Sequence, residues 1–180
     1  MARIALGVSG SIAAYKACDL ASKLVQDGHV VDVIMTEAAQ RFVRPLSLSA
    51  LTHRRVFTDA TWGDDAMPHD HLTVMAEADI FVVAPCTANL LGKLAHGIAD
   101  DVLTAGYLAA ACPVLLAPAM NHRMWAHARV QANVERLRGD GVRFVGPEEG
   151  WLSEDEVGRG RMSEPADLVT AIEETLAETP

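Results

Sequence analysis

The chain has 180 residues, of which 50% are hydrophobic and 22% charged, a balance that predicts one globular domain and excludes disordered and collagen-like chains. Its formal net charge of −9, with no run of Lys or Arg, argues against a nucleic acid or an anionic membrane surface as a partner. Three cysteines without a close pair argue against a disulfide framework, and because no apolar stretch is long enough to span a bilayer, we expect a cytoplasmic protein.

Strand and helix patterns alternate along the chain. In order, they predict a strand at 3–11, a helix at 12–28, a strand at 29–36, short helical pieces at 37–42 and 45–51, a polar stretch at 58–70, a strand at 78–85, a helical stretch at 89–110, a strand at 112–119, a helix at 123–138, a short strand at 141–147, an irregular segment at 148–162 and a final helix at 165–178.

The strands are apolar throughout, which is typical of a parallel sheet that helices cover on both faces. We therefore expect an α/β fold with a single open doubly wound parallel sheet over residues 1–180. In such sheets, ligands bind beyond the carboxyl ends of the strands. The segments expected at that edge are Gly7–Ser11, Met35–Thr36, Pro85–Asn89 and Pro118–Asn121.

The segment Gly7–Ala14 (GVSGSIAA) places small residues and hydroxyl groups where the first strand meets a helix start. The free N–H groups and dipole of a helix start favour a phosphate, so a mononucleotide fits there. The spacing is neither G-x-G-x-x-G nor a P-loop, and the second strand ends in Met35–Thr36 without an acidic ribose ligand, which disfavours NAD and ATP. A tight turn that needs glycine for steric reasons alone is the alternative.

Two other strand ends carry polar side chains. Thr87 and Asn89 are positioned as N-caps of a helix, and capping alone would explain them. A second strand end of similar design delivers the carboxamide of Asn121 to the same edge of the sheet. Two such edges together predict a built pocket.

An H-x-H pair, His69 and His71, precedes the strand at 78–85. It could form a metal fork, but no third ligand is obvious, so we expect no metal and favour a single acid/base histidine. Four other histidines are predicted to be surface or capping residues: His29, His53, His96 and His127.

The segment Glu148–Met162 has no periodicity and is predicted to be a long loop, either a lid or merely mobile.

Five elements in order resemble one protein family. They are G-x-x-G-S-I-A-A-Y-K at 7–16, H-L-x-V-x-x-x-A-D at 71–79, P-x-T-A-N-x-x-x-K-x-A-x-G-x-x-D-D-x-L at 85–103, P-A-M-N-x-x-M-W at 118–125 and G-x-G-R-M at 158–162. Together they resemble the homo-oligomeric flavin-containing cysteine decarboxylases, a family of phosphopantothenoylcysteine and peptidyl-cysteine decarboxylases. The resemblance runs from about residue 3 to residue 177.

The resemblance implies a Rossmann-like flavoprotein domain that binds FMN at a subunit interface, in an assembly built from trimers, either a trimer or a dodecamer. The cofactor-binding residues that it implies are Gly7, Ser9, Gly10, Ser11, Ile12, Thr36, Phe42, Thr87, Ala88, Asn89 and Met120. The implied catalytic residues are His71 and Asn121. The implied substrate-binding residues are Asn121, Met124, Ser153, Glu154, Arg161 and Met162, several of them on a clamp at about 148–162.

The implied chemistry suits these residues. Direct loss of carbon dioxide from cysteine would leave an unstabilised carbanion, whereas oxidation of the thiol-bearing carbon by a flavin creates a C=S group that accepts the electron pair. We expect Asn121 to orient the substrate carboxylate and His71 to manage the thiol proton. A closed clamp would exclude water.

One position departs from the pattern of the coenzyme A branch. Members of that branch usually carry a clamp cysteine that helps to protonate the enethiol, whereas Glu154 stands at the matching position here and no cysteine follows Cys112. The main prediction is therefore oxidative decarboxylation of the C-terminal cysteine of a peptide to an aminoenethiol. The alternative is a phosphopantothenoylcysteine decarboxylase that yields 4′-phosphopantetheine with another proton donor, such as Glu154. The Asn121 element disfavours a flavin prenyltransferase, and His71 together with Asn121 disfavours a non-catalytic scaffold.

Overall fold

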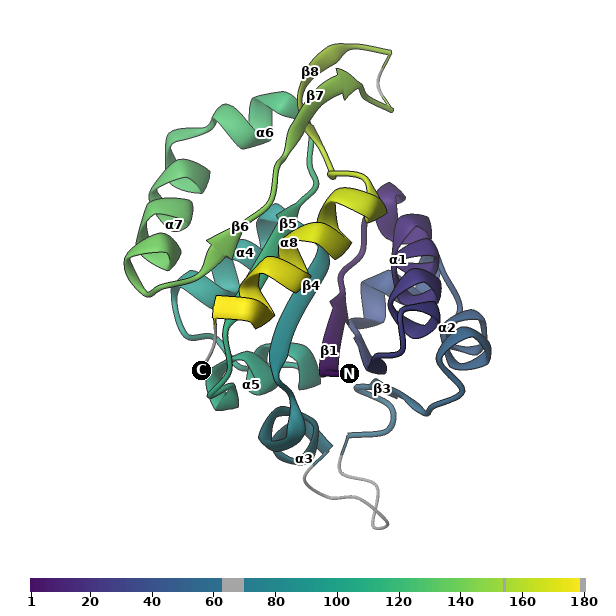
Figure 1. Ribbon diagram of the computed structural model, residues 1–180. Coiled ribbons are helices and arrows are strands. Elements are labelled where there is room, and N and C mark those ends of the chain that lie inside the picture. The colour runs from purple at the N-terminus through teal and green to yellow at the C-terminus, as the bar shows by residue number, and fades with distance from the viewer. Residues whose placement is uncertain (63–69, 154, 179–180) are drawn as a thin grey trace.

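The computed structural model describes residues 1–62, 70–153 and 155–178. Within these ranges, parallel strands form one sheet in the order β3-β2-β1-β4-β5-β6 (Figure 1). The strands are β1 (Arg3–Val8), β2 (Val30–Met35), β3 (Val56–Thr58), β4 (Ile80–Cys86), β5 (Val114–Pro118) and β6 (Arg143–Phe144). This strand order is that of the doubly wound nucleotide-binding folds. The predicted fold class is confirmed.

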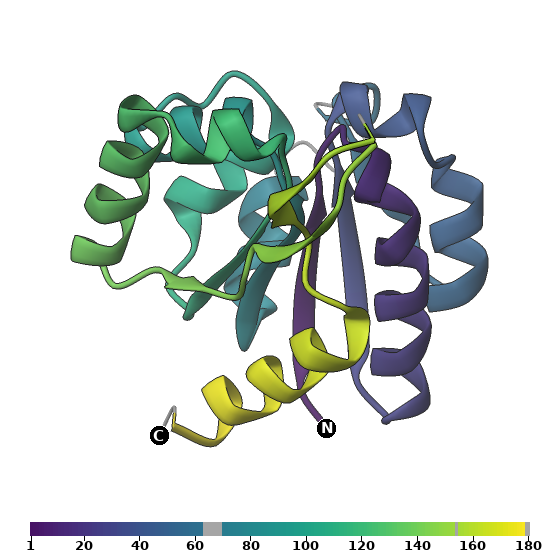
Figure 2. The same cartoon turned by 90° about the horizontal axis from the view of Figure 1, so that it is seen from above.

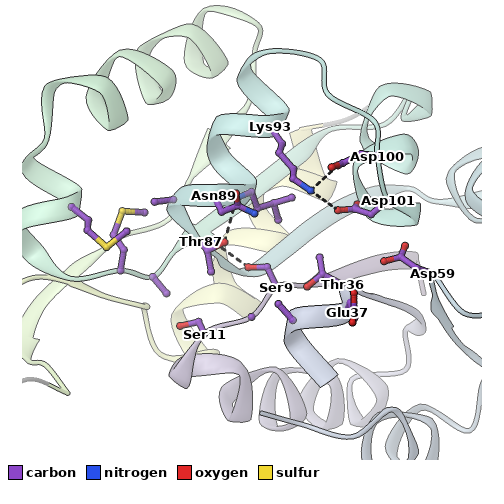
Figure 3. A pocket seen from close by; sticks show the side chains of 17 residues that line it. Ser9, Ser11, Thr36, Glu37, Asp59, Thr87, Asn89, Lys93, Asp100 and Asp101 are labelled. Atoms are coloured by element: carbon purple, nitrogen blue, oxygen red, sulfur yellow. Dashed lines mark hydrogen bonds and ion pairs between the residues drawn. The ribbon is translucent and has the colours of Figure 1, made fainter. Parts of the chain in front are cut away.

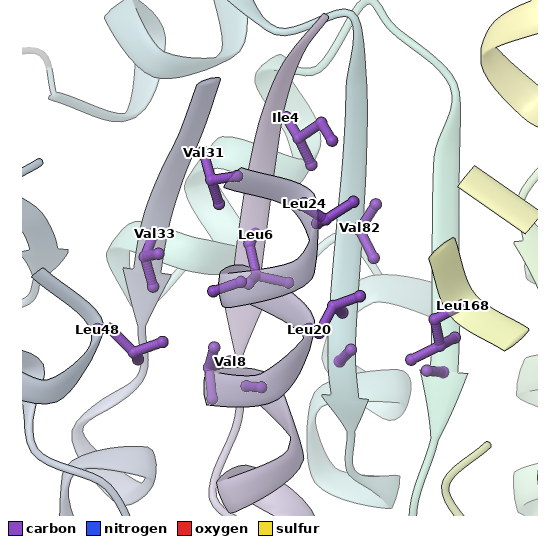
Figure 4. Close-up of a cluster of buried hydrophobic side chains, with 14 of the residues drawn as sticks. Ile4, Leu6, Val8, Leu20, Leu24, Val31, Val33, Leu48, Val82 and Leu168 are labelled. Carbon is purple, nitrogen blue, oxygen red and sulfur yellow. The ribbon is translucent and has the colours of Figure 1, made fainter. Parts of the chain in front are cut away.

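One face of the sheet is covered by α1 (Tyr15–Gln26), α2 (Pro45–Thr52) and α8 (Pro165–Glu178). Leu6 of β1 packs there with Leu20 of α1 and Leu168 of α8, all fully buried (Figure 4). Because α1 and α8 bury their apolar residues mainly on one side, packing that side against the sheet determines which way each of these two helices faces. The final helix lies at the predicted residues.

The opposite face is covered by α3 (Asp70–Glu77), α4 (Ala88–Ala95), α5 (Val102–Ala109) and α7 (Ala128–Gly139), so helices lie on both sides of the sheet (Figure 2). Shorter helical pieces are η1 (Ile12–Ala14), η2 (Glu37–Arg41) and α6 (His122–Ala126). None of the helices in the described ranges has the length and hydrophobicity that a membrane span requires.

Two stretches predicted as single helices are each divided. The stretch at 89–110 becomes α4 and α5, because Gly97 has a φ of +65° and Asp101 begins α5 with a capping box. The stretch at 123–138 becomes α6 and α7, because His127 is extended and caps α7.

The prediction that the histidines are surface or capping residues holds at His127 but not at His29. The His29 side chain is largely buried, its Nδ1 accepts from Ala2 N, and its Nε2 lies 2.6 Å from a Glu173 carboxylate oxygen.

The segment at 148–162, predicted as an irregular loop, contains an antiparallel hairpin of β7 (Glu148–Trp151) and β8 (Val157–Arg161). The prediction of irregular structure is therefore wrong. Glycines at 158 and 160 hide the strand from propensity rules, because glycine is depleted in strands. The hairpin extends from the end of the molecule at which the sheet strands end (Figure 1).

Candidate functional site

Two adjoining cavities lie where the strands end. The first, of about 570 Å³, lies between the loops that follow β1, β2, β4 and β5. The second, of about 640 Å³, lies between η1, the start of α1 and the β7–β8 hairpin. Gly10, Ser11, Ala119 and Met120 line both. The carboxyl edge of the sheet therefore holds the candidate site, as the sequence predicts.

The first cavity gathers most of the residues expected to bind the cofactor. These are Ser9, Gly10, Ser11, Thr36, Thr87, Ala88, Asn89 and Met120. Met124, expected to contact substrate, also lines the first cavity and not the second. Segments that are far apart in the sequence are thus brought to one cavity by the parallel arrangement of β1, β2 and β4.

Three hydroxyl groups of the first cavity, those of Ser11, Thr36 and Thr87, come from three different loops (Figure 3). Each is an N-cap: Ser11 Oγ accepts from Ala13 N, Thr36 Oγ1 from Ala39 N and Thr87 Oγ1 from Leu90 N. A capping hydroxyl uses its oxygen as an acceptor, so its hydrogen is left to donate to a ligand. Convergent O–H donors beside helix starts suit a phosphate.

Asn89 differs from its predicted role as an N-cap. Thr87 is the N-cap of α4, and Asn89 is the second residue inside that helix, so the prediction of Asn89 as a cap is wrong. Its side chain is exposed at the first cavity. The carboxamide is therefore available to a ligand.

Ser9 and Gly7 have structural roles. The buried Ser9 hydroxyl donates to Pro85 O over 2.8 Å and accepts from Thr87 N over 3.1 Å, so it joins the loops after β1 and β4. Gly7 lines neither cavity: a Cβ there would lie 3.1 Å from Leu103 Cδ1. Gly7 is therefore needed because a side chain there would crowd Leu103. Ser9 holds together the two loops that form one wall of the first cavity.

Carboxylates around Lys93 form the far side of the first cavity, and no sequence pattern predicted a role for them. Lys93 Nζ binds Asp100 over 2.6 Å and Asp101 over 3.1 Å (Figure 3). Burial lowers the pKa of Lys93, but the hydrogen bonds to both aspartates outweigh it and raise the pKa overall. Burial raises the pKa of Asp59, and the charges of Asp101 and Glu37 add to this rise. A phosphate would therefore favour the hydroxyl side of the cavity.

Cys86 lies behind this cavity and does not line it. Its side chain is fully buried among apolar neighbours. Burial raises the pKa of the Cys86 thiol well above its usual value, so the thiol stays neutral. Cys86 is thus a small packing residue behind the cavity.

The second cavity gathers further expected residues, one of which, Met120, also lines the first cavity. These are Ile12, Phe42, Met120, Asn121, Ser153, Arg161 and Met162. Tyr15, Lys16, Trp151 and Glu164 also line it, although the sequence analysis did not single them out as site residues. Lys16 is the last residue of the motif at 7–16, and this position was the sequence signal that could have identified it as a site residue.

Asn121 is the N-cap of α6. Its Oδ1 accepts from the backbone N–H of Arg123 over 2.8 Å. Within the described part of the chain, the Nδ2 group has no hydrogen-bond partner, and the residue lines the second cavity. An amide held at its oxygen presents its N–H donors, which suits an anionic ligand such as a carboxylate.

Lys16 fixes the base of the hairpin. Its buried ammonium donates to Met162 O over 3.0 Å and pairs with Glu164 over 2.9 Å. A buried ammonium is stable only when such partners are present. The segment after β8 is thereby tied to α1.

Gly160 allows the hairpin to approach the loop between β5 and α6. Met120 N donates to Gly160 O over 3.0 Å, and a Cβ on Gly160 would lie 2.1 Å from Met120 O. We expect Gly160→Ala to lower the free energy of unfolding by about 1–3 kcal/mol, because the hairpin must move off this loop. Urea denaturation measures the change.

The matched control for this prediction is Gly150→Ala in the same hairpin. A Cβ there would meet only the side chain of Arg161, at 3.0 Å and beyond, which can move aside. Equal stabilities of the two variants would show that the approach at Gly160 carries no cost.

The structure does not bring His71 and Asn121 together within one chain. The backbone of His71 lies in the first turn of α3, and the placement of its side chain is outside the described residues, as are His69 and Glu154. The carboxyl end of α3 lies beside the start of β1, because Arg3 N donates to Asp79 and the Arg3 side chain pairs with Glu77. Figure 1 shows α3 and α6 at opposite ends of the molecule.

Comparison with known proteins gives consistent matches. The Flavoprotein family model matches residues 1–177. The chain is 49% identical to the coenzyme A biosynthesis bifunctional protein CoaBC of Bacillus subtilis over 97% of its own length and 43% of that protein. It is 39% identical to a probable phosphopantothenoylcysteine decarboxylase of Streptococcus mutans, over 97% of this chain and 98% of that one.

Among solved structures, the chain resembles the FMN-dependent cysteine decarboxylase SpaF, with a TM-score of 0.82, 36% identity, and coverage of 99% of this chain and 97% of that one. The chain spans less than half the length of the CoaBC protein of Bacillus subtilis. The match over residues 1–177, together with full-length similarity in sequence and fold, shows that the chain belongs to the Flavoprotein family.

Proposed function

We propose that this protein is an FMN-dependent decarboxylase that acts on the cysteine carboxyl group of phosphopantothenoylcysteine. One structural observation carries the reaction class: a cavity with convergent hydroxyl donors adjoins a second cavity that Asn121 lines. The substrate is supported by the relatives, one a bifunctional coenzyme A protein and one a probable phosphopantothenoylcysteine decarboxylase. They favour this alternative over the peptide substrate that the sequence analysis placed first.

The residues present fit FMN. The hydroxyl groups of Ser11, Thr36 and Thr87 would hold the phosphate, together with the free N–H groups at the start of α4. Bound FMN would supply the electron sink that a cysteine carboxylate lacks, by accepting a hydride from the thiol-bearing carbon. Met120 lines both cavities and would lie between cofactor and substrate.

The chain's own residues then orient the substrate. The Asn121 amide donates to the substrate carboxylate and fixes its direction. The bond between the α-carbon and the carboxylate, which breaks in the reaction, is thereby held in one orientation. The hairpin, with Trp151, Ser153 and Arg161, covers the second cavity and reduces its contact with water.

His71 is proposed to move the thiol proton. Because α3 lies far from α6 in the same chain, a second copy must supply this residue to the site (Figure 1). We therefore propose a homo-oligomer. Its assembly from trimers and its location in the cytoplasm are proposed on the family resemblance. Ile12, Tyr15 and Phe42 line the second cavity and are at least half exposed, which suits apolar surface that a neighbouring copy covers.

A specific observation favours a second candidate function. No cysteine follows Cys112, so a clamp thiol that would protonate the enethiol is absent from the sequence. Without that donor, the product would stay oxidised, as in the decarboxylation of a C-terminal peptidyl cysteine to an aminoenethiol. The alternative proton donor in the coenzyme A interpretation is Glu154.

The test is anaerobic incubation of flavin-loaded protein with 4′-phosphopantothenoyl-cysteine and, separately, with a peptide that ends in cysteine. We expect the first substrate to lose carbon dioxide alone, with the flavin oxidised again after turnover. A peptide that loses carbon dioxide and two hydrogens while the flavin bleaches would establish the second function. If flavin is bound and neither substrate reacts, both proposals fail.

A further inference from the structure

The helix that carries Asn121 is too short to hold its own direction. α6 spans only His122–Ala126, and a helix of this length is not stable without tertiary contacts. On the side of α7, Trp125 is buried and its carbonyl accepts from Gln131 Nε2 over 2.5 Å. On its other side, α6 contacts the β7–β8 hairpin.

The polar side-chain contacts on this side of α6 come from Glu156, between β7 and β8. One carboxylate oxygen accepts from Arg123 Nη2 over 2.9 Å, and the other lies 3.4 Å from His122 Nδ1. His122 and Arg123 directly follow Asn121. The backbone N–H of Arg123 donates to Asn121 Oδ1 over 2.8 Å. Arg123 is therefore held at its side chain by the hairpin and at its backbone by the substrate-facing amide.

Close packing accompanies this ion pair. A Cβ on Gly158 would lie 2.7 Å from His122 Cβ, so His122 lies directly against the backbone of β8. His122 Nδ1 is buried and has no hydrogen-bond partner among the described residues, since the nearby Glu156 oxygen is not aligned. The start of α6 and the start of β8 thus form one packed unit, and the Glu156 carboxylate is its side-chain polar connection, in addition to the backbone bond from Met120 N to Gly160 O.

We propose that Glu156 is a positioning residue that couples the docking of the β7–β8 hairpin to the orientation of the Asn121 amide. The chain of contacts runs from Glu156 to the Arg123 side chain, and from the Arg123 backbone to Asn121 Oδ1. This inference rests on the proposed function, in which Asn121 receives the substrate carboxylate. It predicts that the hairpin affects substrate binding through α6 as well as by covering the cavity.

Glu156→Gln tests the proposal because it keeps the size of the side chain and removes its charge. Exposed ion pairs contribute little individually, so we expect KM for the cysteine substrate to rise roughly threefold to fivefold, with a smaller change in kcat. The melting temperature and FMN content should match the wild type. The matched control is Glu149→Gln in the same hairpin, because Glu149 forms no ion pair within the described residues.

A charge exchange separates coupling from a local structural effect. Arg123→Glu and Glu156→Arg should each raise KM, whereas the double variant should return KM toward the wild-type value, because the pair is restored in reverse. Additive losses in the double variant would overturn the proposal.

Hydrogen exchange provides a readout that needs no substrate. In Glu156→Gln, amides at 121–126 and 157–161 should exchange faster than in Glu149→Gln, while the core strands stay unchanged. Unchanged exchange in these two segments would overturn the coupling. If the wild type turns over no cysteine substrate, the proposed function fails, and the exchange comparison still decides whether Glu156 couples the hairpin to α6.

Discussion

Replacing Asn121 with Asp is expected to lower kcat/KM by about 10²- to 10³-fold while FMN stays bound. The Nδ2 donor is lost, and a carboxylate then faces the carboxylate of the substrate. Asp is as good an N-cap as Asn, so the contact with Arg123 N and the start of α6 should persist. The steady-state rates and flavin absorbance of the purified variant measure the two effects separately.

Asn121→Ser is the companion variant. Serine also caps a helix, but it neither reaches the substrate nor adds a charge, so its loss of kcat/KM should be smaller than that of Asn121→Asp. If Asn121→Asp turned over substrate at the wild-type rate with flavin bound, Asn121 would have no role in holding the carboxylate.

Replacing Gly10 with Ala is expected to weaken FMN binding by about 100-fold, so that turnover falls in proportion to the flavin that remains bound. A Cβ at Gly10 would lie 2.5 Å from Ala38 Cβ and 2.8 Å from the Ala38 carbonyl carbon. The loops after β1 and β2 would then separate, and both line the first cavity. Because the atoms in the way belong to Ala38 itself, no flexible side chain can move aside.

Gly139→Ala is the matched control, since a Cβ there meets nothing within 4 Å and the residue ends α7. Titration of the apoproteins with FMN, followed by flavin fluorescence, compares the two variants. Wild-type FMN affinity in Gly10→Ala would contradict both the predicted cofactor site and the steric argument. It would also leave the first cavity without a proposed ligand.

Local sequence patterns predicted the elements of this fold because each depends on near neighbours. Apolar strands such as Ile80–Cys86 can only be buried on both faces, which implies a parallel sheet under helices. The final helix begins at Pro165, where proline suits a first turn, and its buried positions recur at helical spacing. The capping role of Thr87 follows from its side chain and the helix that starts next.

The peripheral elements were less accessible to local patterns. β3 has three residues, too few to show a period, and β8 contains two glycines that propensity counts against a strand. Those glycines exist because the backbone of β8 approaches Met120 and His122. The two glycines of β8 are thus required by a contact with another segment of the chain, and a rule based on neighbouring residues cannot predict that contact.

By itself, the sequence determined the fold class and the edge of the sheet where the site lies, because buried strands that alternate with helices imply a parallel sheet whose strands all end at one edge. Most of the expected site residues came from the family resemblance and not from local patterns. Only the tertiary structure decided that Ser9 uses its hydroxyl internally, that Lys16 secures the hairpin and that α3 lies far from α6. Each of these facts depends on contacts between residues distant in sequence. Such contacts form only when the chain packs, and the pattern around one residue does not encode them.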